Sequence, residues 1–317
     1  MSTPHRIPGH DGPPLHRAHP GVPCASTGGA QLYLGAEGAR NWLRVIEEPG
    51  YPLNSTDPFG LISMRSNAIS RQTFHSVVSY GPGEGSGELE VLRAAIPTEE
   101  RTVAVEPRWF PVDISEDLLG HAVRRVSREF LVPAQFRADF ESDAHWIEEH
   151  LKPLLEGPSL FTMLGGTFAN LRNGEREFLS GMRRLMSRSD ALLLDVPTAE
   201  HGWSVAIEPR LHADHYSAAF RQFLCCTHHS ASASAPAVDA FETRFRFEHR
   251  TQSSPHAELI RVLDSQTGEV ILAFRRYRLG DLLDYFQEQG FRLLHCQSSL
   301  RVVNQAFSMA VVLLSIE

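Results

Sequence analysis

Between residues 73 and 196, short apolar runs alternate with segments whose apolar residues recur at helical spacing. A β-rich run at 73–80 ends in a glycine-rich turn at 81–87, after which 88–96 has helical character. The same alternation predicts further strands ending at 113 and covering 132–139, 159–164 and 190–196, with helices from 115 and over 143–155 and 175–187. Alternating strands and helices favour a mostly parallel, doubly wound α/β sheet.

The end of the chain follows a different pattern. A helix predicted over 280–289 is followed by strands at 291–296 and 305–316, with no helix after the last strand. Two strands joined by a short link favour an antiparallel addition to the parallel sheet. Between residues 200 and 277, extended runs interrupt the strand and helix alternation, which indicates an inserted lobe.

Composition and charge narrow the class of protein. The chain has 317 residues and a net charge of -8, enough length for one large or two modest domains. Nucleic acid is not expected as a partner, because non-specific binding to it depends on excess positive charge. The longest apolar run, at 309–314, is far too short to span a bilayer, so no membrane crossing is expected. The 4 cysteines form no disulfide framework and the N-terminus lacks an apolar signal core, which favours a reduced cytoplasm.

The glycine-rich turn is the first candidate for ligand binding. Gly81, Gly83 and Gly85 would let a ligand approach the backbone closely, since glycine has no side chain and tolerates positive φ. An anionic group would then lie near the amides that begin the following helix. A dinucleotide fingerprint would place its third glycine at Ser86, so the turn alone fits either a cofactor site or a tight structural turn.

Acidic residues follow the next two strands. Asp113 would lie at the carboxyl end of its strand, where a carboxylate can accept both hydroxyls of a ribose; Glu106 is the rival if the strand lies earlier. Asp139 could accept an adenine amino hydrogen while the ring of Phe140 packs on the base. Because the carboxyl ends of parallel strands face one crevice, the turn and these acids together predict an adenosine site.

Four segments resemble one known family. The sequence FPVDIS at 110–115, ADF at 138–140, LGGTFAN at 164–170 and GEREFL at 174–179 resemble the histidine Nα-methyltransferase-like group of S-adenosyl-L-methionine (SAM)-dependent methyltransferases. The resemblance implies a class I methyltransferase fold, Rossmann-like with an antiparallel last strand, plus a second smaller α+β domain. It implies an acceptor-binding domain from 31–71 and 200–277 and a SAM-binding domain from 72–199 and 278–317, after a flexible tail at 1–30.

The resemblance also implies roles for individual residues. Gly81, Gly83 and Gly85 would surround the methionine part of SAM, Asp113 the ribose, and Asp139 with Phe140 the adenine. Gly165 and Asn170 would lie where donor and acceptor meet, with Asn170 orienting the nucleophile. Tyr51 would face the acceptor, and Tyr51 or Tyr80 could stabilise the sulfonium by cation–π contact.

The chain departs from this family at several positions. Where histidine-methylating members hold their amino acid with a Glu and a Ser, the corresponding positions are Phe274 and Arg276, which cannot accept hydrogens from an ammonium group. The usual acid two residues before the first glycine is replaced by Ser79. We therefore expect the small-molecule acceptor to be an amine other than histidine.

Alternatives remain open at this stage. The general base, needed only for a protonated or hydroxyl acceptor, would come from His212, Asp214 or His215. No metal site is expected, because the adjacent cysteine and histidine pairs at 225–229 lack zinc-ligand spacing. The leading hypothesis is methylation of an amino acid or a specialised metabolite built from one. The others are attack at another carbon of the sulfonium and a non-catalytic SAM-binding protein. No oligomeric state is predicted.

Overall fold

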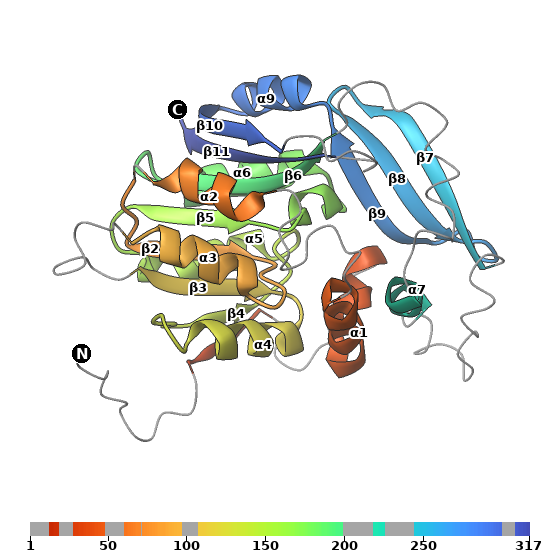
Figure 1. Ribbon diagram of the computed structural model, residues 1–317, viewed down its shortest axis with the longest axis horizontal. Coiled ribbons are helices and arrows are strands. Elements are labelled where there is room, and N and C mark those ends of the chain that lie inside the picture. The colour runs from red at the N-terminus through yellow and green to blue at the C-terminus, as the bar shows by residue number, and fades with distance from the viewer. Residues whose placement is uncertain are drawn as a thin grey trace.

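The computed structural model describes residues 13–18, 28–47, 60–70, 72–96, 107–198, 218–225, 244–299 and 308–317. The larger part is a sheet covered by helices on both faces (Figure 1). Its strands are β2 (Ser76–Tyr80), β3 (Arg108–Asp113), β4 (Gln135–Arg137), β5 (Ser159–Met163), β6 (Ala191–Thr198), β10 (Phe291–Ser298) and β11 (Ser308–Ile316). Its helices are α2 (Leu61–Ile69), α3 (Ser86–Ala94), α4 (Glu116–Val126), α5 (Ala144–Leu151), α6 (Glu175–Leu185) and α9 (Leu279–Glu288), with short 3-10 turns η2 (Lys152–Leu154) and η3 (Thr167–Asn170).

The strand order confirms the predicted doubly wound sheet. Strands β4, β3, β2, β5 and β6 lie side by side and parallel. The last strand, β11, pairs antiparallel with both β6 and β10. Consecutive parallel strands need a crossover, and a helix fills each one, which is why the apolar pattern changes period along the chain.

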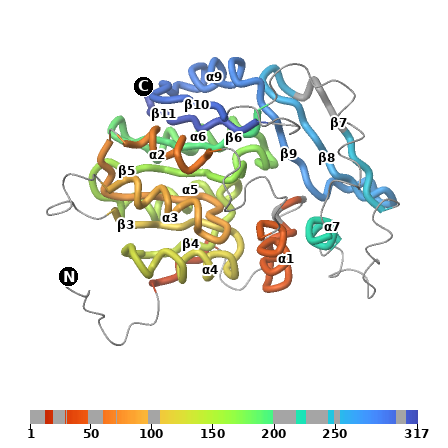
Figure 2. Tube along the Cα trace, viewed as in Figure 1, coloured from red at the N-terminus to blue at the C-terminus, as the bar shows by residue number. Residues whose placement is uncertain are grey.

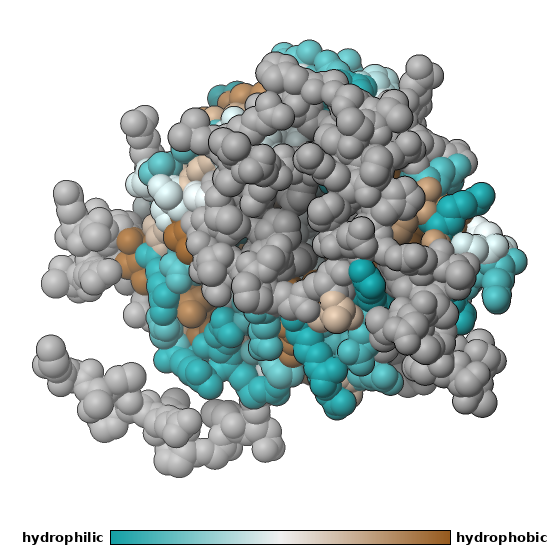
Figure 3. All heavy atoms as spheres, turned by 45° about the vertical axis from the view of Figure 1, so that its right-hand side comes forward, coloured by the Kyte–Doolittle hydropathy of each residue, from teal (hydrophilic) through white to brown (hydrophobic). Residues whose placement is uncertain are grey.

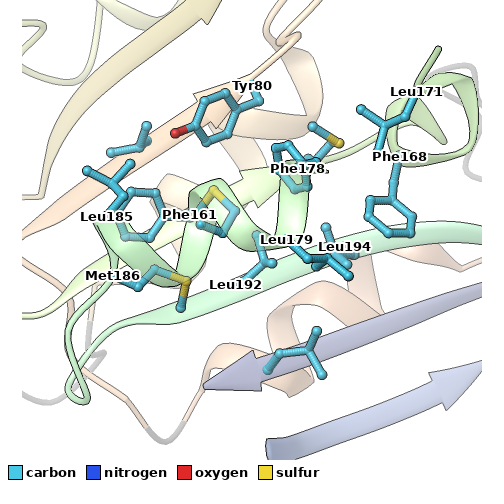
Figure 4. Packing of buried hydrophobic residues seen from close by; sticks show 14 of the residues in the cluster. Tyr80, Phe161, Phe168, Leu171, Phe178, Leu179, Leu185, Met186, Leu192 and Leu194 are labelled. Atoms are coloured by element: carbon cyan, nitrogen blue, oxygen red, sulfur yellow. The ribbon is translucent and has the colours of Figure 1, made fainter. Parts of the chain in front are cut away.

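Alternating residues of each strand bury opposite faces of the sheet. Val77 and Leu193 pack under α2, α3 and α4, whereas the neighbouring Val78 and Leu192 pack under α5, α6 and α9. Figure 4 shows the second cluster, in which the ring of Phe178 from α6 lies among the strand side chains. Because both faces are buried, these strands are almost continuously apolar, as parallel sheets require.

A second unit stands at one end of this sheet. Strands β7 (Phe245–Ser254), β8 (Ala257–Asp264) and β9 (Val270–Tyr277) form an antiparallel sheet. Its core includes side chains from η1 (Gly28–Tyr33), α1 (Gly35–Glu47) and α7 (Ala218–Cys225). Although far apart in sequence, α1 and α7 lie side by side (Figure 2). The two sheets meet where Thr198 at the end of β6 pairs with Tyr277 at the end of β9.

The structure differs from the predicted domain boundaries at two places. Residues 15–17, expected within a flexible tail, form β1 (Leu15–Arg17), which pairs with β4 at the sheet edge; the ring of His16 stacks on Phe136 at 5.1 Å. Helix α2, expected in the acceptor domain, packs on α3 and β11. Its apolar residues Leu61 and Met64 pack into the core of the larger sheet, so α2 belongs with that sheet.

On the face shown in Figure 3, teal hydrophilic side chains form most of the coloured surface, with scattered apolar side chains between them. The large apolar side chains that the described residues expose are Ile62, Leu131, Leu293 and Leu294. Among the same residues, every helix is too short or too polar to span a bilayer.

Candidate active site

A cavity of about 1030 Å³ opens between the carboxyl ends of the parallel strands and the second unit. Its walls come from the loops after β2, β3, β4 and β5, from α1 and from β8 and β9. Seven residues expected at the site from the sequence line this one cavity: Gly81, Gly83, Asp113, Asp139, Phe140, Gly165 and Asn170. Ligand pockets typically measure roughly 300–1,000 Å³, so the cavity has the size for a large ligand or for two smaller ones.

The glycine turn forms one wall. Gly81 and Gly83 have φ of +63° and +56°, and a Cβ on Gly81 would lie 3.0 Å from Cγ2 of Thr167. Gly85 has a different function: a Cβ there would lie 3.0 Å from the Cα of Ala122 in α4, and Gly85 itself does not line the cavity. Gly85 therefore sets how closely α3 packs on α4, while the first two glycines leave the cavity open beside the N-terminus of α3.

Asp113 lies at the end of β3 and is buried. One carboxylate oxygen accepts a hydrogen bond of 2.8 Å from the backbone N–H of Ser115, whose hydroxyl in turn caps α4. Burial raises the pKa of Asp113 to about 7, although the backbone N–H groups of Ser115 and Ile114 oppose that shift. The carboxyl is thus fixed in place and can accept hydrogen bonds from a ligand.

Asp139 and Phe140 follow β4. The Asp139 carboxylate accepts a hydrogen bond of 3.1 Å from the N–H of Glu141 and forms an ion pair with Arg172. Arg172 also contacts Glu141 through Nε at 3.0 Å and lines the cavity beside them. The sequence did not indicate a role for Arg172, because its two acidic partners lie 31 and 33 residues earlier in the chain.

Tyr80 does not line the cavity, contrary to the expectation that it contacts the cofactor. Its ring is 3% exposed and makes edge-on contacts with Phe140 at 5.9 Å and Phe178 at 5.7 Å. Residues 78 and 80 of β2 share the face that α6 covers, and this alternation directs Tyr80 into the core (Figure 4). Tyr80 therefore supports the ring of Phe140.

Gly165 and Asn170 lie in the loop after β5. Gly165 has φ of +65° and nothing within 4 Å of a Cβ placed on it, so its side faces open space. Its N–H donates a 2.9 Å hydrogen bond to the carboxylate of Asp195. Asn170 ends η3 and lines the cavity. The hydrogen bond to Asp195 of β6 therefore fixes one end of the loop, and Asn170, at its other end, borders the cavity.

Asp195 belongs to a charged group that the sequence analysis did not identify. It is fully buried and forms an ion pair with Arg65 of α2, which lines the cavity together with Glu88 of α3. An acid within the apolar run of β6 at 191–196 is the one sequence feature that could have marked this group. The three members of this group come from β6, α2 and α3, so only the fold brings them close together.

Phe274 and Arg276, which were expected to bind the acceptor, do not line the cavity. Phe274 packs against the core of the second unit, and Arg276 is buried opposite Glu258 of β8. From β9 the cavity receives four other side chains: Val270, Leu272, Ala273 and Arg275. Phe274 and Arg276 pair in regular register with Ile260 and Glu258, so strand alternation places them on the face opposite to Ala273 and Arg275.

Arg275 is held by a buried polar network. Its guanidinium lies 3.3 Å from the carboxylate of Glu175 and donates to the carbonyl of Leu171. The hydroxyl of Tyr277 donates to the same carboxylate at 2.9 Å. Although burial opposes ionisation, the partners of Glu175, among them His256 and Arg275, lower its pKa. The network fixes β9 to the loop that carries Asn170.

Other candidates lie outside the described residues: Tyr51, Glu106, His212, Asp214 and His215. Among the residues that the structure does describe, no group of three or more His, Cys, Asp or Glu side chains could hold a metal ion. Cys225, one of the paired cysteines, is buried in the core of the second unit.

Two buried acids at the cavity predict how stability depends on pH. Burial raises the pKa of Asp113 to about 7 and that of Glu88 to about 8. Unfolded carboxyls titrate near pH 4, so between these values the folded chain binds protons that the unfolded chain lacks. The free energy of unfolding should therefore decrease as the pH rises through this window. We expect the ligand-free protein to melt at lower temperature at about pH 9 than at about pH 6.

The double variant Asp113→Asn/Glu88→Gln isolates this contribution, because amides stay neutral at every pH in the window. Its melting temperature should change less with pH than that of the wild type in the same calorimetric scans. An equal decrease in both proteins would show that these acids do not carry the effect.

The sheet order and the cavity at the strand ends define a class of protein. A parallel sheet whose last strand runs antiparallel between its two neighbours, with a glycine turn after β2 and an acid after β3, is the arrangement of class I SAM-dependent methyltransferases. A sequence model of one family, described as histidine-specific SAM-dependent methyltransferases, matches residues 30–202. The chain belongs to this family, and SAM is its cofactor.

Several solved structures that are similar to this chain are methyltransferases, all of low sequence identity to it. A SAM-dependent methyltransferase from Clostridium acetobutylicum is 8% identical over 87% of this chain and 98% of that one, with a TM-score of 0.46. The 1,6-didemethyltoxoflavin-N1-methyltransferase of Burkholderia thailandensis is 9% identical over 88% and 86%, with a TM-score of 0.46. Magnesium protoporphyrin IX methyltransferase of Synechocystis is 10% identical over 90% and 97%, with a TM-score of 0.45. Among curated proteins, the comparison finds no match.

Proposed function

We propose that the protein transfers the methyl group of SAM to the nitrogen of a small-molecule amine, an amino acid other than histidine or a specialised metabolite derived from one. The observation that carries the proposal is the single cavity, which joins the glycine turn and the acids after β3 and β4 to Asn170 and the side chains of β9. The residues at the strand ends fit SAM, because an open glycine cradle lies beside a fixed buried carboxyl.

The cofactor end of the cavity is assigned by chemistry. Gly81 and Gly83 would receive the methionine part of SAM, since side chains there would close the space. The Asp113 carboxylate would accept hydrogen bonds from the ribose hydroxyls. Asp139 would accept a hydrogen from the adenine amino group, and Phe140 would pack on the base, supported from behind by Tyr80.

The acceptor end combines apolar side chains with charged ones, among them Arg261 and Glu269. Leu272 and Ala273 of β9 border it, together with the indole of Trp42 from α1, and Arg275 adds a cation that Glu175 already partly balances. The four β9 side chains offer no carboxylate or hydroxyl to an amino-acid ammonium group, whereas Glu269, the residue before β9, brings a carboxylate to the cavity wall. The choice of an acceptor other than histidine therefore rests on the departures from the family at positions 274 and 276. Tyr51, outside the described residues, keeps its proposed place beside the acceptor.

The reaction is an in-line displacement at a methyl group. SAM supplies that methyl on a sulfonium, which leaves readily as a thioether. The protein positions the acceptor: the side-chain oxygen of Asn170 would accept a hydrogen from the amine and direct its lone pair towards the methyl. Holding the reacting atoms about 3 Å apart can account for several kcal/mol of the barrier. The apolar walls of Leu272 and Ala273 would keep water from the amine.

Incubation with methyl-labelled SAM and a panel of amino acids and related amines, followed by mass spectrometry, tests the proposal. We expect labelled amine together with S-adenosylhomocysteine (SAH), and no methylated histidine. Methylthioadenosine would instead show attack at another carbon of the sulfonium. Neither product, despite SAH binding and a panel covering the apolar amines, would favour a non-catalytic protein.

Replacing Asn170 with Ala separates catalysis from cofactor binding. We expect kcat to fall by roughly 10- to 100-fold because the amine loses its orienting contact, while the Kd for SAH stays within about twofold. Asn173→Ala is the matched control, since Asn173 is exposed in the same segment and does not line the cavity. Equal turnover by the Asn170 and Asn173 variants would remove Asn170 from the mechanism.

A further inference from the structure

Glu88 is a buried acid that faces the cavity. It lies in the first turn of α3, is 3% exposed, and lines the cavity beside the glycine turn. Its carboxylate is hydrogen-bonded by its own backbone N–H. Within the described part of the chain, no ion pair or side-chain hydrogen bond joins this carboxylate to another residue. Buried acids are usually paired, so a carboxyl in this position indicates a missing partner.

The charged groups around Glu88 are already engaged. Arg65 of α2 is the cation whose charge acts on Glu88, and it forms an ion pair with Asp195 of β6. Glu84, in the glycine turn, pairs with Arg125 at 2.6 Å. The neighbourhood of Glu88 therefore contains balanced pairs plus one extra carboxyl, which complements a cationic ligand group.

Within β2 itself, the residue closest to the place of an acid is Ser79. Ser79, two residues before Gly81, is fully buried. Its hydroxyl oxygen accepts hydrogen bonds from Trp109 at 2.9 Å and from Thr162 at 2.8 Å. Ser79 is thus committed to the packing of three strands, and the carboxyl available beside the glycine turn is that of Glu88.

We infer that the Glu88 carboxylate binds the ammonium group of the methionine part of SAM. That end of SAM carries one ammonium and one carboxylate. The backbone N–H groups at the start of α3, beside Gly83 and Gly87, are suited to the carboxylate. The carboxyl of Glu88 on the same turn is suited to the ammonium, and the assignment holds for any methyl acceptor.

Contact with an ammonium group should change the protonation state of the Glu88 carboxyl. Burial raises the pKa of Glu88 to about 8; Arg65 opposes the shift, while Asp195 and Glu84 reinforce it. At pH 7 the free protein therefore carries most of this carboxyl in its protonated form. An ammonium beside it favours the ionised form, so binding should release the proton of Glu88.

Calorimetry with two ligands tests the inference. SAH has the amino-acid end, and 5′-methylthioadenosine lacks it but keeps the adenosine. In Glu88→Gln we expect SAH to bind at least about tenfold more weakly than in the wild type, with the affinity for methylthioadenosine unchanged. Titrations in buffers of different ionisation enthalpy should show more proton release for SAH than for methylthioadenosine in the wild type, and no such excess in the variant.

Two further variants complete the design. Glu129→Gln, which changes an exposed acid that does not itself line the cavity, should bind both ligands as the wild type does. Glu88→Asp, which keeps the charge, should retain part of the preference for SAH. Because methylthioadenosine binding also reports folding of the adenosine site, a misfolded variant would lose both ligands. If Glu88→Gln and Glu88→Asp both keep the wild-type ratio of SAH to methylthioadenosine affinity, or if the excess proton release persists in Glu88→Gln, the inference is overturned.

Discussion

Replacing Asp113 with Ala is expected to weaken SAH binding by about a hundredfold or more. A hydrogen bond to a charged group contributes roughly 1.5–3 kcal/mol, and a carboxylate that accepts both ribose hydroxyls makes two of them. Loss of both corresponds to at least two powers of ten in Kd. The residue is suited to this role because its carboxyl is buried and already fixed by the N–H of Ser115. Isothermal titration with SAH measures the change.

Asp117→Ala provides the control for the Asp113 variant. Asp117 is an exposed acid in the first turn of α4, next to the same loop but away from the cavity. It should leave the Kd for SAH unchanged. Asp113→Asn should fall between the wild type and Asp113→Ala, because the amide keeps one oxygen acceptor. Wild-type affinity in Asp113→Ala would eliminate the ribose assignment.

Replacing Asp195 with Ala should destabilise the protein by about 3–5 kcal/mol, because the buried guanidinium of Arg65 loses its counter-charge. Asp195 is fully buried and Arg65 is 8% exposed, so little solvent is present to screen the charge that remains. The N–H of Gly165 loses its acceptor as well. The loop that carries Asn170 should then loosen, so kcat should fall with stability. Denaturant unfolding followed by circular dichroism measures the free energy of unfolding.

A comparison of variants isolates the buried charge. The double variant Arg65→Met/Asp195→Leu removes both charges, and it should cost less stability than Asp195→Ala alone. The exposed pair of Arg93 and Glu129 serves as the reference, since removing Glu129 should cost no more than about 1 kcal/mol. If Asp195→Ala costs as little as Glu129→Ala, the ion pair does not hold the loop.

The alternation of strands and helices could be predicted because each element carries its own period. The strand at 159–164 and the helix at 175–187 were expected from apolar spacing alone, and β5 and α6 match them closely. Strand β1 was missed because its three residues have no apolar alternation and gain order only by pairing with β4. The position of α2 depends on the core into which its apolar face packs, and the spacing of apolar residues does not specify that core.

Some residues of the candidate site could also be predicted from the sequence, and others could not. Asp113 and Asp139 were expected at strand ends, and parallel strands end at one edge, so the structure brings both to one cavity. Tyr80 and Phe274 were expected at the site but pack in the cores, because the face that each strand presents to the cavity cannot be predicted from these residues alone. Glu88 went unrecognised as a binding residue, because its significance depends on Arg65 of α2 and Asp195 of β6, which lie near it and pair with each other. Chemistry shared by distant elements has no local sequence signature.

A crystal structure with bound SAH tests the central claim most directly, namely that the loops after β2, β3, β4 and β5 form the cofactor site. We predict the ribose hydroxyls on the Asp113 carboxylate, the adenine between Asp139 and Phe140, and the sulfur facing the part of the cavity that Asn170 borders. SAH bound elsewhere, or with its adenine in the acceptor end beside β9, would contradict the account.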